Sequence, residues 1–159
     1  DVANLTPDVL PILQVPDPRL RLVAAGVVDV AAPEVIQAIA SLRATAKTLR
    51  FGGGLAAPQL GISLRIIYIG KETLGHDVLI NPVFKPTSSE KLRGLESCYS
   101  VDDANQEVRL SRYAQGRLLA TLPNGRRIKK HVRGFAARIV QHEIDHLDGI
   151  TIDMVGAVL

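Results

Sequence analysis

One segment near the end of the chain, residues 134–149, constrains the fold and the chemistry more than any other. It reads Gly-Phe-Ala-Ala-Arg-Ile-Val-Gln-His-Glu-Ile-Asp-His-Leu-Asp-Gly. Its interior has no Gly or Pro and consists mostly of apolar residues or good helix formers, and Gly149 is a typical helix terminator. Because apolar residues occur on several sides of this helix, we expect it to be buried at the centre of the fold.

This segment holds His142, Glu143 and His146 in an H-E-x-x-H arrangement. Residues four apart lie on the same face of a helix, so both imidazoles can reach one metal ion. Glu143 is then beside the open side of the metal, where a general base for water is needed. Histidine pairs at this spacing also arise by chance as ordinary core or surface residues. The intervening glutamate and the expected burial favour a metal site, which needs a third ligand from elsewhere.

Cys98 is the single cysteine of the chain. One thiol cannot form an intramolecular disulfide, which fits a reducing compartment, and a lone cysteine is most often a small buried apolar residue. A thiolate with two imidazoles would provide three protein ligands and leave a fourth position open, as in catalytic sites. Such a site accepts iron(II), zinc, cobalt or nickel, so the ligands alone do not select the metal.

The composition is that of an ordinary folded protein. Apolar residues make up 47% and charged residues 22% of the 159 residues, which leaves room for one domain with a substantial core. No apolar run approaches the roughly 18 residues of a membrane span, and no signal-peptide pattern opens the chain, so we expect a soluble protein. The first residue is Asp1 rather than Met, which fits a chain from which a start methionine or a targeting peptide has been removed.

The charge balance is basic, with a net charge of +3 and a pI near 9.2, which would suit an anionic partner. The densest basic run, residues 126–130, alternates around an apolar residue and follows a turn, so a solvated hairpin strand is favoured over a nucleic-acid site. The chain has no Trp, three Tyr and three Phe, so stacking platforms for bases are not expected. Docking near a ribosome or another anionic surface stays open.

The first half of the chain is expected to contain an arm, a helix and a glycine-rich connection. Prolines keep most of residues 1–32 extended or turned, and apolar residues at helical spacing predict a helix from Pro33 to Arg50. Residues 51–61 include three consecutive glycines, which let the backbone pass very close to a ligand or another element. This is not a phosphate loop, because the Gly-Lys-Ser/Thr ending is missing. A flexible helix-to-strand connection is the structural alternative.

The second half reads as short strands followed by the central helix. Buried strands are predicted at residues 65–69 and 78–80, with Asn81-Pro82 ending the second. Residues 88–94 are predicted as a loop. Strands at residues 117–122 and 127–132 flank an Asn-Gly turn, which is a strong hairpin signal.

Residues 151–155 are apolar enough for a final strand. The whole pattern predicts an α+β fold, with short, mostly antiparallel sheets packed around the central H-E-x-x-H helix and with an N-terminal helix.

Three separated stretches together resemble the peptide deformylase family. They are Gly-x-Gly-Leu-Ala-Ala-Pro-Gln at residues 52–59, Glu-x-Cys-x-Ser at residues 96–100 and Gln-His-Glu-x-Asp-His-Leu-x-Gly at residues 141–149. They occur in the family's order and with similar separations. Shorter similarities at Arg19-Leu20, Ile80-Asn81-Pro82 and residues 134–138 extend the resemblance over nearly the whole chain. The last motif, coupled to a distant cysteine, separates it from the common zinc proteases.

The resemblance implies a single metallohydrolase domain over residues 1–159 that removes the N-formyl group from the initiating methionine of new polypeptides and releases formate. Glu143 would be the general acid and base, and Gln59 would donate its side-chain amide to the oxyanion together with the backbone N–H of Tyr99. The implied metal ligands are Cys98, His142 and His146. The metal would be iron(II), with zinc, nickel or cobalt as alternatives. The partners would be N-formyl-methionyl peptides or nascent chains, in a bacterial cytoplasm or an organelle matrix or stroma.

Two positions depart from the family pattern. Gly53 stands where a branched apolar residue usually lines the pocket for the methionine side chain, and Ser97 stands where a glycine usually precedes the cysteine. Tyr99 replaces a common leucine, a milder change because its expected contribution is through the backbone. The residues expected to contact substrate are Gly53, Gly54, Ser97, Phe135 and Ile139.

Three functional interpretations follow. The first is an active deformylase with altered side-chain selectivity. The second is a weakly active relative that binds N-terminal peptides, an alternative that Gly53 and Ser97 favour. The third, an unrelated metal peptidase that cuts internal bonds, is disfavoured because no third zinc ligand follows on or just after the H-E-x-x-H helix.

Overall fold

The computed structural model describes residues 8–50 and 53–158, and for residues 157 and 158 it describes the backbone alone. The predictions for Pro7 and for Phe51-Gly52 therefore fall outside the described residues. Among the described residues, no helix is both long and apolar enough to cross a membrane.

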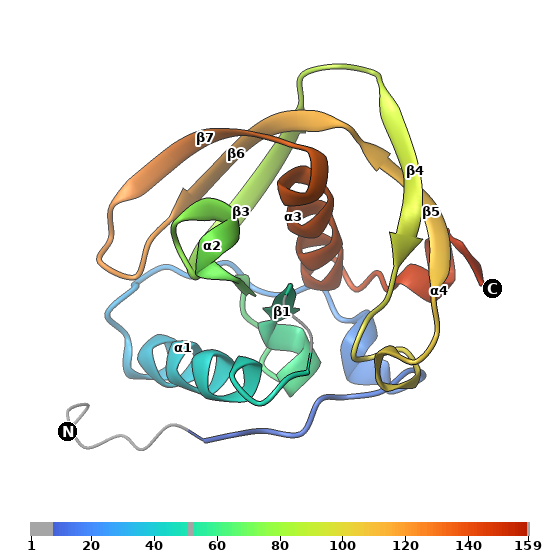
Figure 1. Cartoon of the computed structure of the whole chain (residues 1–159). Helices are drawn as coiled ribbons and strands as arrows, with labels where there is room; N and C mark the ends of the chain where they lie inside the picture. The colour runs from blue at the N-terminus through green and yellow to red at the C-terminus, as the bar shows by residue number, and fades with distance from the viewer. Residues whose placement is uncertain (1–7, 51–52, 159) are drawn as a thin grey trace.

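Two antiparallel sheets lie on either side of one central helix (Figure 1). The five-stranded sheet has the order β1 (Gly54–Ala56), β2 (Ile66–Ile69), β3 (Val78–Pro86), β6 (Gln115–Thr121) and β7 (Arg127–Arg133). The three-stranded sheet has the order β4 (Lys91–Glu96), β5 (Val108–Tyr113) and β8 (Ala157–Val158). The α-helices are α1 (Pro33–Ala46), α2 (Lys71–Leu74), α3 (Gly134–Leu147) and α4 (Ile152–Val155), and the 3-10 turns are η2 (Pro18–Arg21), η3 (Ala57–Leu60) and η4 (Asp102–Ala104). This arrangement confirms the predicted α+β class.

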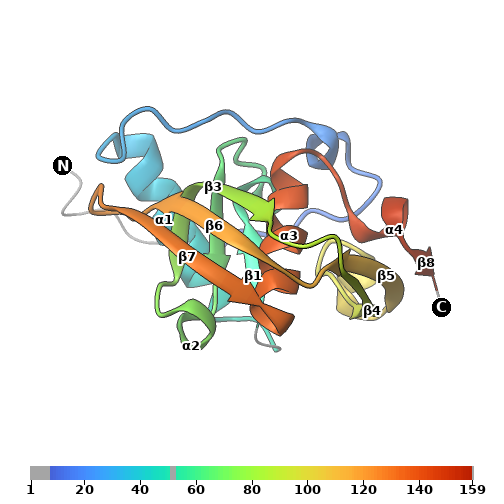
Figure 2. The ribbon, with the colours of Figure 1, turned by 90° about the horizontal axis from the view of Figure 1, so that it is seen from above.

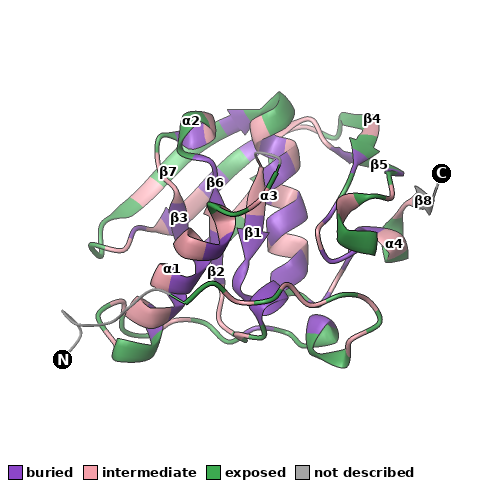
Figure 3. Cartoon of the chain, turned by 60° about the horizontal axis from the view of Figure 1, so that its bottom comes forward, coloured by how far each residue is buried: buried purple, intermediate pink, exposed green. Residues whose placement is uncertain are grey.

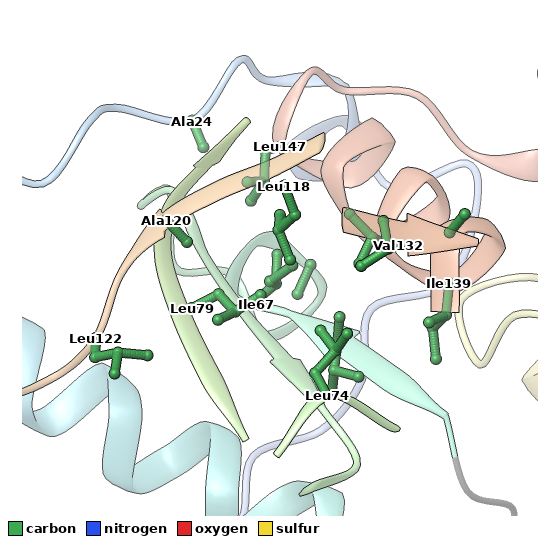
Figure 4. Close-up of a cluster of buried hydrophobic side chains, with 14 residues drawn as sticks. Ala24, Ile67, Leu74, Leu79, Leu118, Ala120, Leu122, Val132, Ile139 and Leu147 are labelled. Atoms are coloured by element: carbon green, nitrogen blue, oxygen red, sulfur yellow. The ribbon is translucent and has the colours of Figure 1, made fainter. Parts of the chain in front are cut away.

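Helix α3 is held in the middle by its apolar side chains. Ala137, Val140 and Leu147 are fully buried in a cluster with residues of β2, β3, β6 and β7 (Figure 4). Each fully buried valine or leucine stabilises the fold by about 1.5–3 kcal/mol. Buried residues occur along most of the helix (Figure 3), as the distribution of apolar residues predicts. Gly149 follows with a φ of +75°, in the left-handed conformation that terminates helices at this position.

A second cluster packs α1 against β1, β2 and β3. The predicted helix Pro33–Arg50 ends earlier, at Ala46. Beyond that point, the backbone N–H and the hydroxyl of Thr48 both donate to the carbonyl of Thr45, at 3.0 and 2.7 Å, which turns the chain out of the helix. Leu49 still packs against the second cluster, so its helical spacing reflects burial rather than helix.

The N-terminal arm ties together three segments that are distant in the sequence. Backbone N–H groups of the arm donate to carbonyls of η3, of the segment after β4 and of the end of α3. These hydrogen bonds are Leu13 to Gln59, Val15 to Ser100 and Ala24 to Leu147, each of 2.8 Å. The predicted extended arm over the body is therefore present in residues 8–32, with one 3-10 turn inserted.

Three predictions of secondary structure are wrong. The strand predicted to end at Asn81-Pro82 continues to Pro86, because a register shift between Ile80 and Val83 accommodates both residues and Asn81 takes a φ of +51°. Residues 91–94, predicted as loop, belong to β4. This strand lies at the edge of its sheet and most of its residues are exposed, so its sequence lacks the buried apolar positions that would indicate a strand. Residues 152–155, predicted as strand, form α4, with Ile152 buried and Met154 and Val155 exposed.

The hairpin prediction is confirmed. Strands β6 and β7 pair in antiparallel register from Gln115–Arg133 to Thr121–Arg127, and Gly125 in the connecting turn has a φ of +88°. Strand β5 and helix α2 were not predicted. Helix α2 has only four residues, which is too short for a helical period to show.

Candidate metal and catalytic site

Three segments converge on one cavity of about 240 Å³. They are the region from Gly53 to Gln59, the end of β4 with residues 97–99, and residues 135–143 of α3. Every predicted site residue except His146 lines this cavity. His146 lies deeper and is 1% exposed. The tertiary fold thus gathers residues that are up to 93 positions apart, from Gly53 to His146.

Cys98, His142 and His146 bring three donor atoms together, all within 4.8 Å of one another. Cys98 Sγ lies 3.3 Å from His146 Nε2. Helix α3 positions both imidazoles one turn apart, whereas Cys98 follows the end of β4 and packs in a third cluster with Val101, Val108 and Leu110. One thiol and two imidazoles at this spacing match the donor set of a catalytic transition-metal site with an open position.

The electrostatics of the two histidines also fit a cation. Burial alone would lower the pKa of His142, but the neighbouring Glu143, Cys98 and Glu96 raise its pKa well above the ordinary value. His146 has its pKa lowered well below the ordinary value, first by burial and then by the charges of His142 and Arg112. The pocket therefore favours one positive charge among these donors and disfavours a second, as expected where a single metal ion takes the place of the proton.

A buried carboxylate orients His142 from behind. Glu96 Oε1 accepts a hydrogen bond from His142 Nδ1 at 2.7 Å, which leaves Nε2 free for the metal side. Arg112 donates to both oxygens of Glu96 at 3.0 Å, and Arg138 Nη1 donates to Glu96 Oε2 at 2.6 Å. Burial would raise the pKa of Glu96, but the hydrogen bonds from His142 and Arg112 hold its pKa well below the usual range. A carboxylate that fixes a histidine in this way is a common partner of metal-binding imidazoles.

The sequence analysis did not assign roles to Glu96, Arg112 or Arg138. Glu96 opens the Glu-x-Cys-x-Ser stretch and Arg138 is on α3, so two of them lie within or near recognised motifs. Arg112 sits in β5, which was not predicted as a strand. The available signal was a charged residue, Glu96, close in sequence to the expected ligand Cys98. Its partner Arg112 could not be predicted, because the ion pair joins residues of two different strands, β4 and β5.

Glu143 is buried beside the two histidines. It is 2% exposed, and its Oε1 has no hydrogen-bond partner among the described residues. Burial raises its pKa to about 7, and Glu96 and Asp145 act in the same direction while His142 and Arg112 oppose them. A carboxylate with a pKa near neutrality can both take up and release a proton at working pH.

Gly54 allows this carboxylate to approach β1. A Cβ atom at position 54 would lie 2.5 Å from Glu143 Oε2, a distance at which Cβ atoms essentially never contact other heavy atoms. The glycine-rich stretch was expected to permit a close backbone approach to a ligand or to another element, and the structure places α3 there.

Gln59 is 2% exposed and has its amide held in one orientation. Its Oε1 accepts from the backbone N–H of Ala56 at 2.8 Å, so Nε2 faces the site. There Nε2 donates to Ser100 Oγ at 3.1 Å and lies 3.6 Å from Cys98 Sγ. This geometry presents an N–H donor next to the expected metal site. The backbone of Tyr99 lies in the same cavity wall, and its carbonyl accepts from Gln14 Nε2 at 2.5 Å.

The five residues expected to contact substrate all line the cavity, with Phe135 at its rim and 63% exposed. A Cβ atom at Gly53 would lie 3.5 Å from Ile139 Cδ1, so a branched residue there would contact Ile139. Gly53 and Gly54 also line a neighbouring cavity of about 170 Å³ that includes Tyr68 and Glu72. Both glycines therefore contribute only backbone to the walls of the two cavities.

Comparisons with known proteins agree with this site. The family model described as polypeptide deformylase matches residues 9–155. Peptide deformylase 1 of Bordetella pertussis is 39% identical over 147 residues, covering 87% of this chain and 82% of the relative. Peptide deformylase 1 of Prochlorococcus marinus is 36% identical over 149 residues, covering 87% of this chain and 76% of the relative.

Solved structures show the same likeness in three dimensions. The peptide deformylase of Thermotoga maritima has a TM-score of 0.83 at 28% identity, over 93% of this chain and 97% of that one. A class I type b peptide deformylase of Acinetobacter baumannii with bound Met-Ala-Ser has a TM-score of 0.81 at 30% identity, over 94% of this chain and 99% of that one.

Proposed function

Because this chain belongs to the peptide deformylase family and is therefore a metal-dependent hydrolase that acts on N-terminal peptides, we propose that the cavity around Cys98, His142 and His146 removes the formyl group from N-formyl-methionyl polypeptides and releases formate. The observation that carries this proposal is that Cys98, His142, Glu143 and Gln59 line one cavity and that the donor atoms of Cys98, His142 and His146 lie within 4.8 Å of one another. The family match over residues 9–155 supports a single metallohydrolase domain.

The metal would be held by Cys98, His142 and His146. Bound there, a divalent ion supplies a Lewis acid that makes water nucleophilic near neutral pH. A donor set with one soft thiolate is compatible with iron(II), our proposed native ion, and with zinc, nickel or cobalt. Glu96 would hold His142 in the tautomer with its proton on Nδ1, so that Nε2 is free to bind.

The protein's own groups would handle the protons and the developing charge. Glu143, with a pKa of about 7, would take the proton from the attacking water and pass it to the leaving amine. Gln59 Nε2, together with the backbone N–H of Tyr99, would donate to the oxygen that becomes negative when the formyl carbon turns tetrahedral. Removing one such donor typically raises the barrier by about 3 kcal/mol.

The first side chain of the substrate would lie against Gly53, Gly54, Ser97, Phe135 and Ile139. The open wall at Gly53 and the hydroxyl of Ser97 support a selectivity that is shifted from that of relatives with a branched residue and a glycine at these positions. The same two residues support the second candidate, a weakly active protein that binds N-terminal peptides. We propose that the protein is located in a bacterial cytoplasm or an organelle, where formylated nascent chains are available. There it would contact the ribosome transiently.

The test is formate release from formyl-Met-Ala-Ser by protein loaded with iron(II) or nickel(II), beside its Glu143→Ala variant. Loss of the general acid and base should lower turnover by about 10²–10⁴-fold while metal content, measured by elemental analysis, stays at one ion per chain. Near-normal turnover by the metal-loaded variant would remove Glu143 from this role. Peptide binding without formate release by the wild type would select the second candidate.

A further inference from the structure

The outer face of β3, β6 and β7 carries a set of side chains that the strand register brings together. Lys85 pairs with Arg117, which pairs with His131 on the other side. Successive side chains of a strand point to opposite faces, and paired residues share a face. Phe84 and Leu118, the neighbours of Lys85 and Arg117 in sequence, pack against the core, so Lys85 and Arg117 lie on the opposite, outer face. Figure 2 shows the strands β3, β6 and β7 that form this face. We call this surface the basic face; it holds the Lys and Arg residues Lys85, Arg117, Arg127, Lys129 and Arg133, together with His131.

The basic face is unusual in its charge. It holds five of the 19 Lys and Arg residues of the chain and none of the 16 Asp and Glu residues. Because the whole chain has a net charge of only +3, the remainder carries more acidic than basic side chains. Within residues 8–50 and 53–158, none of these five cations forms an ion pair within 4.0 Å.

This arrangement works against the stability of the sheet. Lys85 and Arg117 lie directly opposite one another on β3 and β6, and like charges in this position are destabilising. An ordinary solvated sheet face mixes both signs of charge. The basic run at residues 126–130 alone favours a solvated strand, but the register adds Lys85, Arg117 and Arg133 to the same surface, and an anionic partner would relieve their repulsion.

The basic face also leads to the mouth of the active-site cavity. Strand β7 ends at Arg133, and α3 starts with the next residue. Arg133 lines a surface hollow together with Gly53 and Phe135, and both of these also line the active-site cavity. A partner bound along β7 would therefore lie beside the entrance for substrate.

We propose that the basic face binds the phosphodiester backbone of RNA. The face has no Phe, Tyr or Trp side chain on which bases could stack, so it suits contact with the backbone rather than with the bases. Its cations are spaced by about 7 Å along a strand and about 5 Å between strands, which offers several phosphates a partner at once. The choice of RNA rests on the proposed function, because formylated polypeptides are made on an RNA-based particle.

Fluorescence anisotropy with a short labelled RNA duplex and metal-loaded protein tests this proposal over a range of salt concentrations. The triple variant Arg117→Gln, Arg127→Gln, Lys129→Gln should lose at least about tenfold in affinity, and the slope of log affinity against log salt should shrink by about 3. The matched control is Lys47→Gln, Arg93→Gln, Arg109→Gln, which removes the same charge from exposed positions just after α1 and within β4 and β5. The control should bind RNA almost as the wild type does.

Formate release should be unchanged in both triple variants, which also shows that they are folded. No RNA binding by the wild type at low salt would overturn the proposal, as would equal losses in the two triple variants. Tighter binding to a DNA duplex, or stronger binding to vesicles containing phosphatidylserine, would overturn the choice of RNA. RNA binding that persists in a protein unable to release formate would contradict the proposed function and leave the binding property of the basic face standing.

Discussion

At the scale of single residues, the site depends on Gly54, which has no side chain, and on Glu96, whose role was not predicted from the sequence. Gly54 leaves the space that Glu143 occupies, and Glu96 holds the imidazole of His142. Gly54 therefore affects the chemistry through the position of Glu143, and Glu96 affects it through the orientation of His142. Each can be tested by a substitution that leaves the three donor atoms of the metal site unchanged.

Gly54→Ala should displace the general base. The new Cβ atom would lie 2.5 Å from Glu143 Oε2 and 2.8 Å from its Cγ, so the carboxylate or β1 must move. Since a misplacement of about 1 Å can cost about 10²-fold in rate, we expect a loss of this order in kcat with metal content unchanged. The control is Gly26→Ala, whose Cβ would meet its nearest atom at an ordinary 3.8 Å. Equal kcat values for the two variants would argue against this role of Gly54.

Glu96→Gln should weaken metal binding. The amide cannot match the charge of the carboxylate toward His142, Arg112 and Arg138, and the loss of such a partner typically lowers metal affinity by about 10–100-fold. Competition with a chromophoric chelator measures this affinity without relying on turnover. Asp145→Asn is the comparison, because it removes a carboxylate from Arg112 but leaves the Glu96–His142 hydrogen bond in place. An affinity of Glu96→Gln equal to that of Asp145→Asn would contradict the positioning role.

At the scale of elements, the N-terminal arm packs against the C-terminal end of helix α3. Gly149 lies directly against the backbone of Arg21, and the nearby Ala24 N–H donates to the carbonyl of Leu147. The sequence pattern predicts that Gly149 terminates the helix. The packing of the arm adds a second reason for a glycine here, because only a residue without a side chain leaves room for the backbone of Arg21. A side chain there would have to push the arm away.

Gly149→Ala should therefore destabilise more than Gly75→Ala. Both glycines have positive φ values, +75° and +83°, but a Cβ at Gly75 would meet nothing within 4 Å. The left-handed conformation costs an alanine about 1–2 kcal/mol, which is all that we expect for Gly75→Ala. The clash with Arg21 should add about 1–3 kcal/mol for Gly149→Ala. Urea unfolding gives both values, and equal losses would show that the arm yields without cost.

At the scale of the whole molecule, the proposed metal joins separate parts of the fold. Cys98 belongs to the segment after β4, and its small apolar cluster includes Ile152 of α4, whereas both histidines belong to α3. The N-terminal arm bonds to these same regions at Ser100 and Leu147. Binding of an ion by the folded state alone should therefore stabilise the complete molecule rather than one local segment.

Removal of the metal by a chelator should lower the midpoint of thermal unfolding. At a free metal concentration of 100 times the dissociation constant, binding stabilises the folded state by about 2.7 kcal/mol. For a chain of this size that corresponds to a decrease of about 5–10 °C. The Cys98→Ala variant, which lacks one donor, should show little response to the chelator. A wild-type midpoint that does not respond would mean that the site is not filled in the folded protein.

The sequence by itself determined the chemistry and the class of fold. The placement of His142, Glu143 and His146 on one helix follows from the helical period, and the β6–β7 hairpin follows from Asn124-Gly125, because both are local properties of the chain. Only the tertiary structure decided what surrounds them. The pairing of Glu96 with Arg112, the approach of Gly54 to Glu143 and the gathering of the basic face all join residues that are distant in sequence. The edge strand β4 read as loop for a related reason, since its pattern reflects exposure to solvent, which depends on neighbours that local sequence does not specify.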